Sequence, residues 1–126
     1  MIRRSSGGDR LSLQGRAKRR PSVAAVFTTG SWGPFPDQDQ DFQARWREFS
    51  AWATGLPGAG RATLSRDLRD PARYVSFIEW ESWDAMRAWK DHPEFKSRMS
   101  KVQAHIDKFA PTEIELVAEC RDGLVL

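Results

Sequence analysis

The segment from Arg73 to Trp89 constrains the fold more than any other part of the chain. Its first half alternates as a β-strand does, with Tyr74, Ser76, Ile78 and Trp80 on one face and Val75, Phe77, Glu79 and Glu81 on the other. Both faces carry large apolar side chains, so both need a cover. From Ser82 the segment is expected to become a helix that ends near Trp89. We therefore predict a sheet covered by helices on one face and by a second copy of the same sheet on the other, which makes the protein a homodimer.

The rest of the chain supplies the remaining elements of one α+β domain. Strands are predicted over residues 23–29, 61–68, 73–81 and 112–121, and a loop over residues 31–36, where a glycine and two prolines interrupt the first strand. Helices are predicted over residues 39–56 and 82–89, the second with Ser82 as its N-cap. A further helix is predicted from Asp91 through Phe109, because its apolar residues recur at steps of four and three, and Pro111 is expected to end it. The order β-α-β-β-α-β is that of the ferredoxin-like fold with an antiparallel sheet.

Charge is distributed unevenly along the chain. Residues 1–21 hold seven of the 20 Lys and Arg residues, one acidic residue and no apolar stretch. The whole chain has a net charge of +3, so the remainder is mildly acidic. We interpret residues 1–21 as a disordered basic tail, residues 22–121 as the folded domain and residues 122–126 as a C-terminal tail. Because nucleic-acid binding needs a basic face on the fold itself, no nucleic-acid partner is predicted.

The sequence offers few residues for metal or cofactor chemistry. His92 and His105 have no Cys, Asp or Glu at ligand spacing, and Phe42 replaces the glycine that a calcium loop starting at Asp37 would need. Cys120 is the only cysteine, which excludes an intramolecular disulfide and fits a reducing compartment. No apolar run is long enough to span a bilayer. We expect no metal, no cofactor and no membrane contact, and a cytoplasmic location.

Residues 74–82, followed by Ala85, Trp89 and the sequence from His92 to Phe95, resemble the antibiotic biosynthesis monooxygenase family. The resemblance covers roughly residues 23–119 and implies a dimeric α+β barrel of ferredoxin-like fold. It also implies a cofactor-independent monooxygenase that acts on a planar aromatic or phenolic small molecule with molecular oxygen. The alternatives are a non-catalytic small-molecule-binding or stress-response dimer and, less favoured, a haem-binding or haem-degrading protein.

The haem-degrading branch of that superfamily uses an asparagine in the first strand, a tryptophan at the position of Trp89 and a haem-ligating histidine. This chain keeps the tryptophan. It has Val26 or Phe27 where the asparagine would lie, and Arg98 or Met99 where the histidine would lie. Neither a guanidinium nor a thioether replaces the imidazole that holds the iron in that branch, so a haem role is disfavoured.

Three aromatic residues and one histidine are the candidate site residues. Trp80 and Trp89 flank the junction of strand and helix and are predicted to line a pocket for a flat ligand, with Phe27 of the first strand as a further contact. His92 is the candidate acid or base, because imidazole titrates near neutral pH and this residue follows Trp89 at a helix start. The alternative for His92 is a solvent-facing side chain at that helix start.

Overall fold

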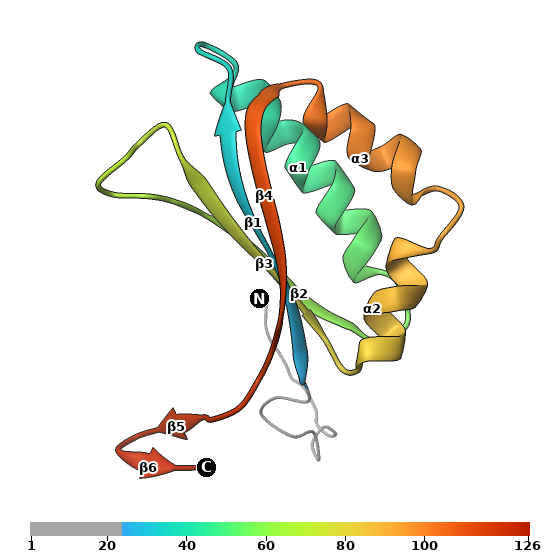
Figure 1. Cartoon of the computed structure of the whole chain (residues 1–126), viewed down its shortest axis with the longest axis vertical. Helices are drawn as coiled ribbons and strands as arrows, with labels where there is room; N and C mark the ends of the chain where they lie inside the picture. The colour runs from blue at the N-terminus through green and yellow to red at the C-terminus, as the bar shows by residue number, and fades with distance from the viewer. Residues whose placement is uncertain (1–23) are drawn as a thin grey trace, which may run out of the picture.

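The body of the molecule is an antiparallel four-stranded sheet with three helices on one of its faces (Figure 1). The computed structural model describes residues 24–126, and the predicted basic tail lies outside them. The strands are β1 (Val26–Pro34), β2 (Ala59–Arg66), β3 (Tyr74–Trp80) and β4 (Ile106–Glu115), in the order β2-β3-β1-β4. The helices are α1 (Asp39–Thr54), α2 (Trp83–Lys90) and α3 (Phe95–Gln103). The predicted ferredoxin-like α+β fold is confirmed, with the second helical region divided between α2 and α3.

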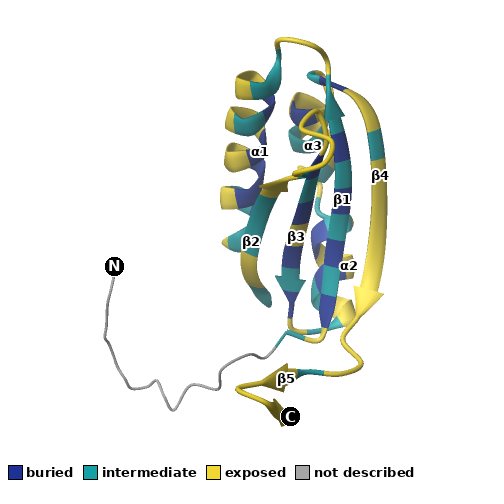
Figure 2. Cartoon of the chain, turned by 90° about the vertical axis from the view of Figure 1, so that its left-hand side faces the viewer, coloured by how far each residue is buried: buried dark blue, intermediate teal, exposed yellow. Residues whose placement is uncertain are grey.

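The two faces of the sheet differ sharply in burial. The predicted alternation of β3 is confirmed, since Tyr74, Ser76, Ile78 and Trp80 are all buried beneath the helices. The opposite face carries no described helix (Figure 2), and Phe77 at its centre keeps 41% of its surface exposed. We call these the helix face and the open face of the sheet.

Strand β1 runs further than the sequence pattern indicated. The predicted loop over residues 31–36 is wrong in its first half, because Ser31, Trp32 and Gly33 continue to pair with β4 as far as Pro34. The proline stands at the last position of the strand, where the register shifts and its missing N–H costs no regular ladder hydrogen bond. The extension matters because it carries Trp32 into the core, where it is 4% exposed.

Helix α3 is shorter than predicted, and β4 begins earlier. The helix ends at Gln103, so the prediction of helix through Phe109 is wrong, as is the expectation that Pro111 ends it. Ile106 pairs with Pro34 and Phe109 pairs with Trp32, with a register shift between these two pairs. One extra residue in β4 therefore places Ile106 and Phe109 on the same face although they lie three apart, which mimics a helical repeat. Pro111 is tolerated because β4 is an edge strand.

Local hydrogen bonds mark the start of α2 and the end of β2. Ser82 is confirmed as the N-cap of α2, since its Oγ accepts a hydrogen bond of 3.0 Å from the backbone N–H of Ala85. Helix α1 ends at Thr54, two residues before the predicted end. Strand β2 ends at Arg66 and not at Leu68, because Asp67 begins the turn to β3. The Asp67 carboxylate accepts hydrogen bonds from the backbone N–H groups of the turn and pairs with Arg73, and these bonds hold its pKa below the usual value.

The N–H of Leu116 still donates to the carbonyl of Ala25, and the residues after it leave the body and form an arm (Figures 1 and 2). The arm holds a short hairpin of β5 (Cys120–Arg121) and β6 (Leu124–Val125), so the prediction of a fourth strand continuous to residue 121 is wrong beyond Glu115. Val117, Leu124 and Val125 are largely exposed along this arm. Within residues 24–126, no helix has both the length and the apolar character that crossing a membrane requires.

Candidate functional site

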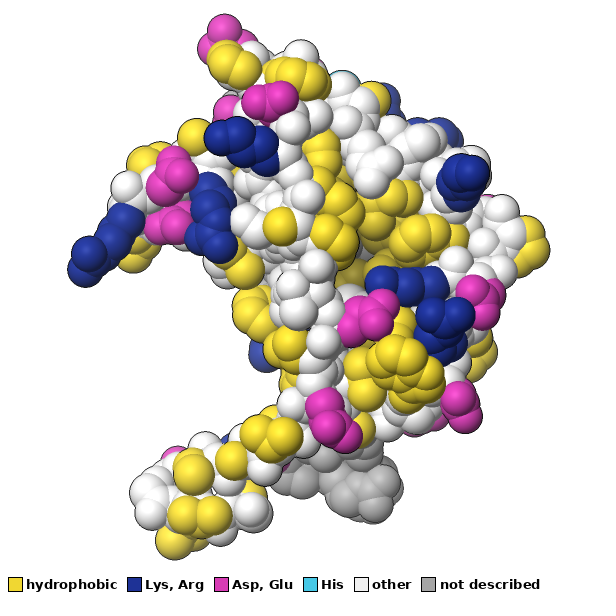
Figure 3. Space-filling view, viewed as in Figure 1, with side chains coloured by type: hydrophobic (Ala, Val, Ile, Leu, Met, Phe, Trp, Pro, Cys, Tyr) yellow, Lys and Arg dark blue, Asp and Glu magenta, His cyan; other side chains and the backbone are white. Residues whose placement is uncertain are grey.

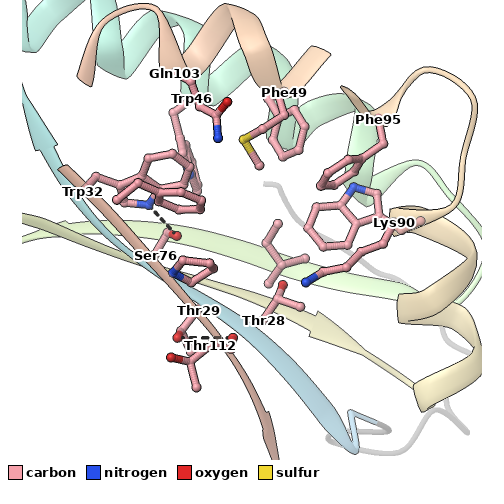
Figure 4. Close-up of a pocket in the computed structure, with 15 residues that line it drawn as sticks. Thr28, Thr29, Trp32, Trp46, Phe49, Ser76, Lys90, Phe95, Gln103 and Thr112 are labelled. Carbon is pink, nitrogen blue, oxygen red and sulfur yellow. Dashed lines mark hydrogen bonds between the residues drawn. The ribbon is translucent and has the colours of Figure 1, made fainter. Parts of the chain in front are cut away.

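A cavity of about 210 Å³ lies between the helix face of the sheet and the helices. In Figure 3 it is the hollow whose walls are mostly hydrophobic, with charged side chains at its rim. Figure 4 shows its lining, which comes from β1, β3, β4 and all three helices. The residues that line it are Thr28, Thr29, Trp32, Trp46, Phe49, Ser76, Ile78, Trp89, Lys90, Phe95, Met99, Gln103, Phe109, Pro111 and Thr112.

One end of the cavity is an aromatic wall built on Trp89. The indole of Trp80 lies behind it, stacked at 4.9 Å between ring centroids and tilted by 30°. Phe95 meets Trp89 edge-to-face at 4.9 Å, and Phe49 lies 5.9 Å away. The Nε1 atom of Trp89 is buried and has no hydrogen-bond partner among the described residues. Rings held this closely by one another form a rigid wall against which a flat ligand can stack.

The other end of the cavity is set by Trp32. Its ring stacks on Phe109 at 4.3 Å, and its Nε1 donates a 2.9 Å hydrogen bond to the Oγ of Ser76 on the neighbouring strand. This geometry needs a glycine two residues earlier, because a Cβ on Gly30 would lie 2.6 Å from that Nε1 atom. Gly30 thus lets the indole fold back over its own strand and close that end of the cavity.

Two hydroxyls on the sheet, those of Thr28 and Ser76, lie at the floor of the cavity. Each accepts an indole N–H, Thr28 from Trp80 at 3.2 Å and Ser76 from Trp32 at 2.9 Å. Neither hydroxyl donates a hydrogen bond to another described residue. Because a hydroxyl has one proton to donate, both keep that proton available for a ligand oxygen.

Lys90 is the only charged residue among the described residues that line the cavity. It ends α2, and in Figure 4 its ammonium points towards the sheet, on the side of the Thr28 hydroxyl. Its Nζ donates a short hydrogen bond to Glu113 on β4, with the two side chains 27% and 31% exposed. The ion pair therefore joins α2 to the edge of the sheet at the rim of the cavity.

The structure brings one of the predicted aromatic residues directly to this cavity. Trp89 lines it, whereas Trp80 is fully buried behind Trp89 and supports it from the sheet. Phe27 lies on the open face, where it borders a separate hollow with Phe77 and the Arg61–Glu79 ion pair.

Neither histidine lines the cavity. His92 lies in the turn between α2 and α3, where its Nδ1 accepts the backbone N–H of Glu94 at 3.0 Å and its ring meets Trp52 edge-to-face. His105 is hydrogen-bonded to Gln38 at 2.9 Å. Of the two residues at the position of the haem-ligating histidine, Met99 lines the cavity and Arg98 pairs with Glu94. No cluster of metal-ligating side chains occurs among residues 24–126.

Several cavity residues were not singled out from the sequence. Trp46 and Phe49 were visible only as part of the apolar stripe of α1, which looks like ordinary core. Trp32 falls within the predicted loop over residues 31–36. Lys90 is one of five lysines in the chain, and only its position at the end of α2, directly after Trp89, distinguishes it.

Comparisons with known proteins agree with this architecture. The model of the family described as antibiotic biosynthesis monooxygenase matches residues 26–100. SnoaB, a cofactor-independent oxygenase from Streptomyces nogalater, is 19% identical, with 75% of this chain and 94% of that chain covered and a TM-score of 0.67. A Deinococcus radiodurans protein described as an antibiotic biosynthesis monooxygenase is 13% identical, with 76% and 96% covered and a TM-score of 0.68. A conserved protein from Methanosarcina mazei is 14% identical, with 74% and 93% covered and a TM-score of 0.66.

No curated protein sequence matches the chain. The likeness to the solved structures, all below 20% identity in these three cases, shows a shared fold. The family match rests on the sequence itself and spans well over half of the chain. The chain therefore belongs to the antibiotic biosynthesis monooxygenase family.

Proposed function

We propose that this protein is a cofactor-independent monooxygenase that acts on a planar aromatic or phenolic small molecule. The observation that carries the proposal is the open, aromatic cavity between sheet and helices, whose end wall is Trp89. Its volume of about 210 Å³ is below the roughly 300–1,000 Å³ of pockets for drug-sized ligands, which favours a ligand of one or two fused rings.

The reaction needs no external reductant if the substrate is electron-rich. A phenol and dioxygen give a quinone and water: one oxygen atom enters the ring as the new carbonyl and the other leaves in the water. The ring C–H and phenolic O–H bonds break, and the substrate itself supplies the electrons. The protein's part is to exclude water, hold the ring and favour loss of the phenolic proton.

The polar groups of the cavity can favour loss of the phenolic proton. The hydroxyls of Thr28 and Ser76 have protons to donate to a substrate oxygen, and their orientation is held by the indoles of Trp80 and Trp32. Donors fixed before the ligand arrives stabilise negative charge that develops on such an oxygen, because they need no reorganisation.

Of the predicted site residues, only Trp89 keeps its proposed role as a direct ligand contact, and the roles proposed for Trp80 and Phe27 change. Trp89 is proposed to contact the ring, and Trp80 to hold Trp89 in place. We propose His92 as an acid or base only if the turn after α2 brings its imidazole to the rim of the cavity. In the structure its Nδ1 atom accepts a hydrogen bond from the backbone N–H of Glu94. Replacement of His92 by Gln tests this, since unchanged pH dependence of turnover would remove it from the mechanism. Phe27 is proposed to contribute to the surface of the open face and not to the cavity.

A non-catalytic binding protein is the second candidate. It is favoured because none of the lining residues within 24–126 carries an imidazole or a carboxylate, and Lys90 is the only charged group among them. The two candidates separate in one experiment, because a binding protein retains aromatic ligands without consuming oxygen.

We also propose that the protein is a homodimer joined through the open faces of two sheets. Phe77 and Ile114 on that face keep 41% and 40% of their surfaces exposed, and the arm adds Val117 and Val125. A hairpin whose strands have two residues each, such as β5–β6, has little stability of its own. We therefore propose that its apolar side chains pack against the partner subunit.

Oxygen consumption by the purified full chain tests the oxygenase, with a panel of hydroquinones and polyphenols as substrates. We expect at least one to gain an oxygen atom from isotope-labelled dioxygen in its ring as oxygen disappears, which simple oxidation of a hydroquinone to a quinone would not give, and Trp89→Ala to reduce its turnover at least about tenfold through lost positioning. Trp83→Ala is the matched control, because Trp83 lies on the same helix and is 52% exposed. Full activity of the Trp89→Ala variant would place the reaction elsewhere.

A further inference from the structure

The cavity has a strongly one-sided electrostatic character. The other lining residues in the described part of the chain are apolar or neutral, whereas Lys90 brings a positive charge to the wall. Its side chain is 27% exposed and extends beside apolar surface. A charge in such surroundings interacts more strongly with a nearby ion than it would in bulk water.

The counter-charge of Lys90 comes from a residue that is not part of the cavity lining. Glu113 accepts a hydrogen bond from Nζ but does not belong to the lining. The positive member of the ion pair thus borders the cavity and the negative member does not. An ammonium has three N–H donors, and Glu113 is its only hydrogen-bonded partner among the described residues, so donors remain for a ligand.

The neutral polar groups on the floor of the cavity also act as hydrogen-bond donors towards a ligand. Thr28 and Ser76 already accept indole N–H groups, which leaves each of them a proton to donate. The floor of the cavity therefore has two unused hydroxyl donors, and the ammonium of Lys90 adds more at the rim. An acceptor-rich ligand satisfies them, whereas a purely apolar ring would leave them without partners at a free-energy cost.

We infer that the cavity selects a planar aromatic anion whose negative oxygen binds the ammonium of Lys90 while its ring stacks against Trp89. This inference rests on the proposed function, since it names the substrate class of the same cavity: an ionised phenol, enol or aromatic acid. Lys90 then keeps the ligand deprotonated, and Glu113 competes with the ligand for the ammonium. The competing interpretation is that the Lys90–Glu113 pair only ties α2 to β4.

Two probes with the same ring system separate these interpretations. Naphthoate is an anion at neutral pH, and naphthamide is a neutral molecule of nearly the same shape. Calorimetric titration of the full chain at low salt should show naphthoate binding at least about tenfold more tightly, because charge-assisted hydrogen bonds are roughly twice as strong as neutral ones. Lys90→Met keeps the apolar stem and should reduce naphthoate binding to the level of naphthamide. Lys96→Met, an exposed position on α3 that does not line the cavity, should leave the preference intact.

The partner carboxylate supplies a second, opposite test. Glu113→Gln frees the ammonium and should strengthen naphthoate binding without changing that of naphthamide. A purely structural ion pair instead predicts that Lys90→Met and Glu113→Gln act in the same direction on both probes. Circular dichroism checks that each variant is folded, and the Glu113→Gln result decides the matter if Lys90→Met does not fold.

The outcomes separate this inference from the proposed oxygenase. Equal binding of both probes by the wild-type protein, or a preference that survives Lys90→Met, overturns the inference and leaves the oxygenase proposal standing. A clear preference for naphthoate in a protein that oxidises nothing supports the inference and contradicts the oxygenase. Binding of neither ring overturns both, since the cavity would then not be an aromatic site.

Discussion

The two faces of the central strands β1 and β3 show how one sheet provides two kinds of surface. On the helix face, Trp80 and Ser76 are almost completely buried, and the indole of Trp80 has a hydrogen-bond partner in Thr28. On the open face, one residue away along β3, Phe77 remains 41% exposed. The helix face is well packed around an open cavity, whereas the open face exposes the apolar side chains of Phe77 and Ile114, and no other described element covers them. Unfilled space under the helices suits a small molecule, and an uncovered apolar face suits a protein partner.

The strongest test of this difference is the removal of Trp80. This indole is fully buried, stacks on Trp89 and donates to Thr28, so Trp80→Ala should lower the free energy of unfolding by about 3–5 kcal/mol. Trp83→Ala removes an indole that is 52% exposed and should change it by about 0.5 kcal/mol or less. Urea unfolding followed by circular dichroism measures both. Similar losses in the two variants would mean that Trp80 does not anchor the helix face.

The open face is tested by a charge at its centre. Phe77→Lys should prevent two sheets from packing, because burying an unpaired ammonium costs several kcal/mol, and should raise the dimer dissociation constant at least about a hundredfold. Trp83→Lys places the same charge on an exposed aromatic position of α2 and should leave association unchanged. Sedimentation at micromolar concentration reads the result. A wild-type monomer, or a Phe77→Lys dimer, would contradict the proposed interface.

The hydroxyl of Thr28 gives a smaller and more specific effect. Thr28→Val leaves the N–H of Trp80 buried without an acceptor and should cost about 1–3 kcal/mol of stability. Thr63→Val lies on the open face and should cost much less. Combining Thr28→Val with Trp80→Phe removes both polar partners, so the double variant should lose less than the sum of the single ones. Strict additivity in chemical denaturation would show that the hydrogen bond contributes nothing.

Asp67 belongs to neither face and should give the smallest effect. Hydrogen bonds from the N–H groups of the turn and the contact with Arg73 hold the pKa of Asp67 below its ordinary value of 3.8, so folding favours the carboxylate. That stabilisation is present above pH 3.8 and is lost as the pH falls through the lower folded-state pKa. Asp67→Asn should therefore lower the melting temperature slightly at neutral pH and match the wild type in strong acid. A difference between the two proteins that persists unchanged in acid would contradict this assignment.

The parts of the fold that the sequence predicted well depend on local patterns. The alternation of β3 and the Ser82 cap of α2 are local, and the structure confirms both. The end of β1 and the start of β4 were wrong because each is decided by the other strand. Pro34 and Ile106 pair across a register shift that no local pattern reveals, and that shift let a strand imitate a helical repeat.

The candidate site also contains residues that local patterns predict and residues that they do not. Trp89 was identified because it follows β3 at the junction with α2, and it lines the cavity. Trp32 and Phe109 face each other only because β1 and β4 pair, and the contribution of Lys90 depends on how α2 lies against β4. Contacts between residues far apart in the sequence are set by strand register and helix placement, so local periodicity could not have supplied them.

The central claim is that the cavity on the helix face, and not the hollow on the open face, receives the ligand. Fluorine NMR of protein that carries fluorotryptophan at its six tryptophan positions tests it directly during a naphthoate titration. The account predicts that the signals of Trp32, Trp46 and Trp89, which line the cavity, shift with ligand concentration, while the signal of the exposed Trp83 stays in place. Shifts confined to Trp83, or no shift at the three lining positions while naphthoate binds, would contradict it.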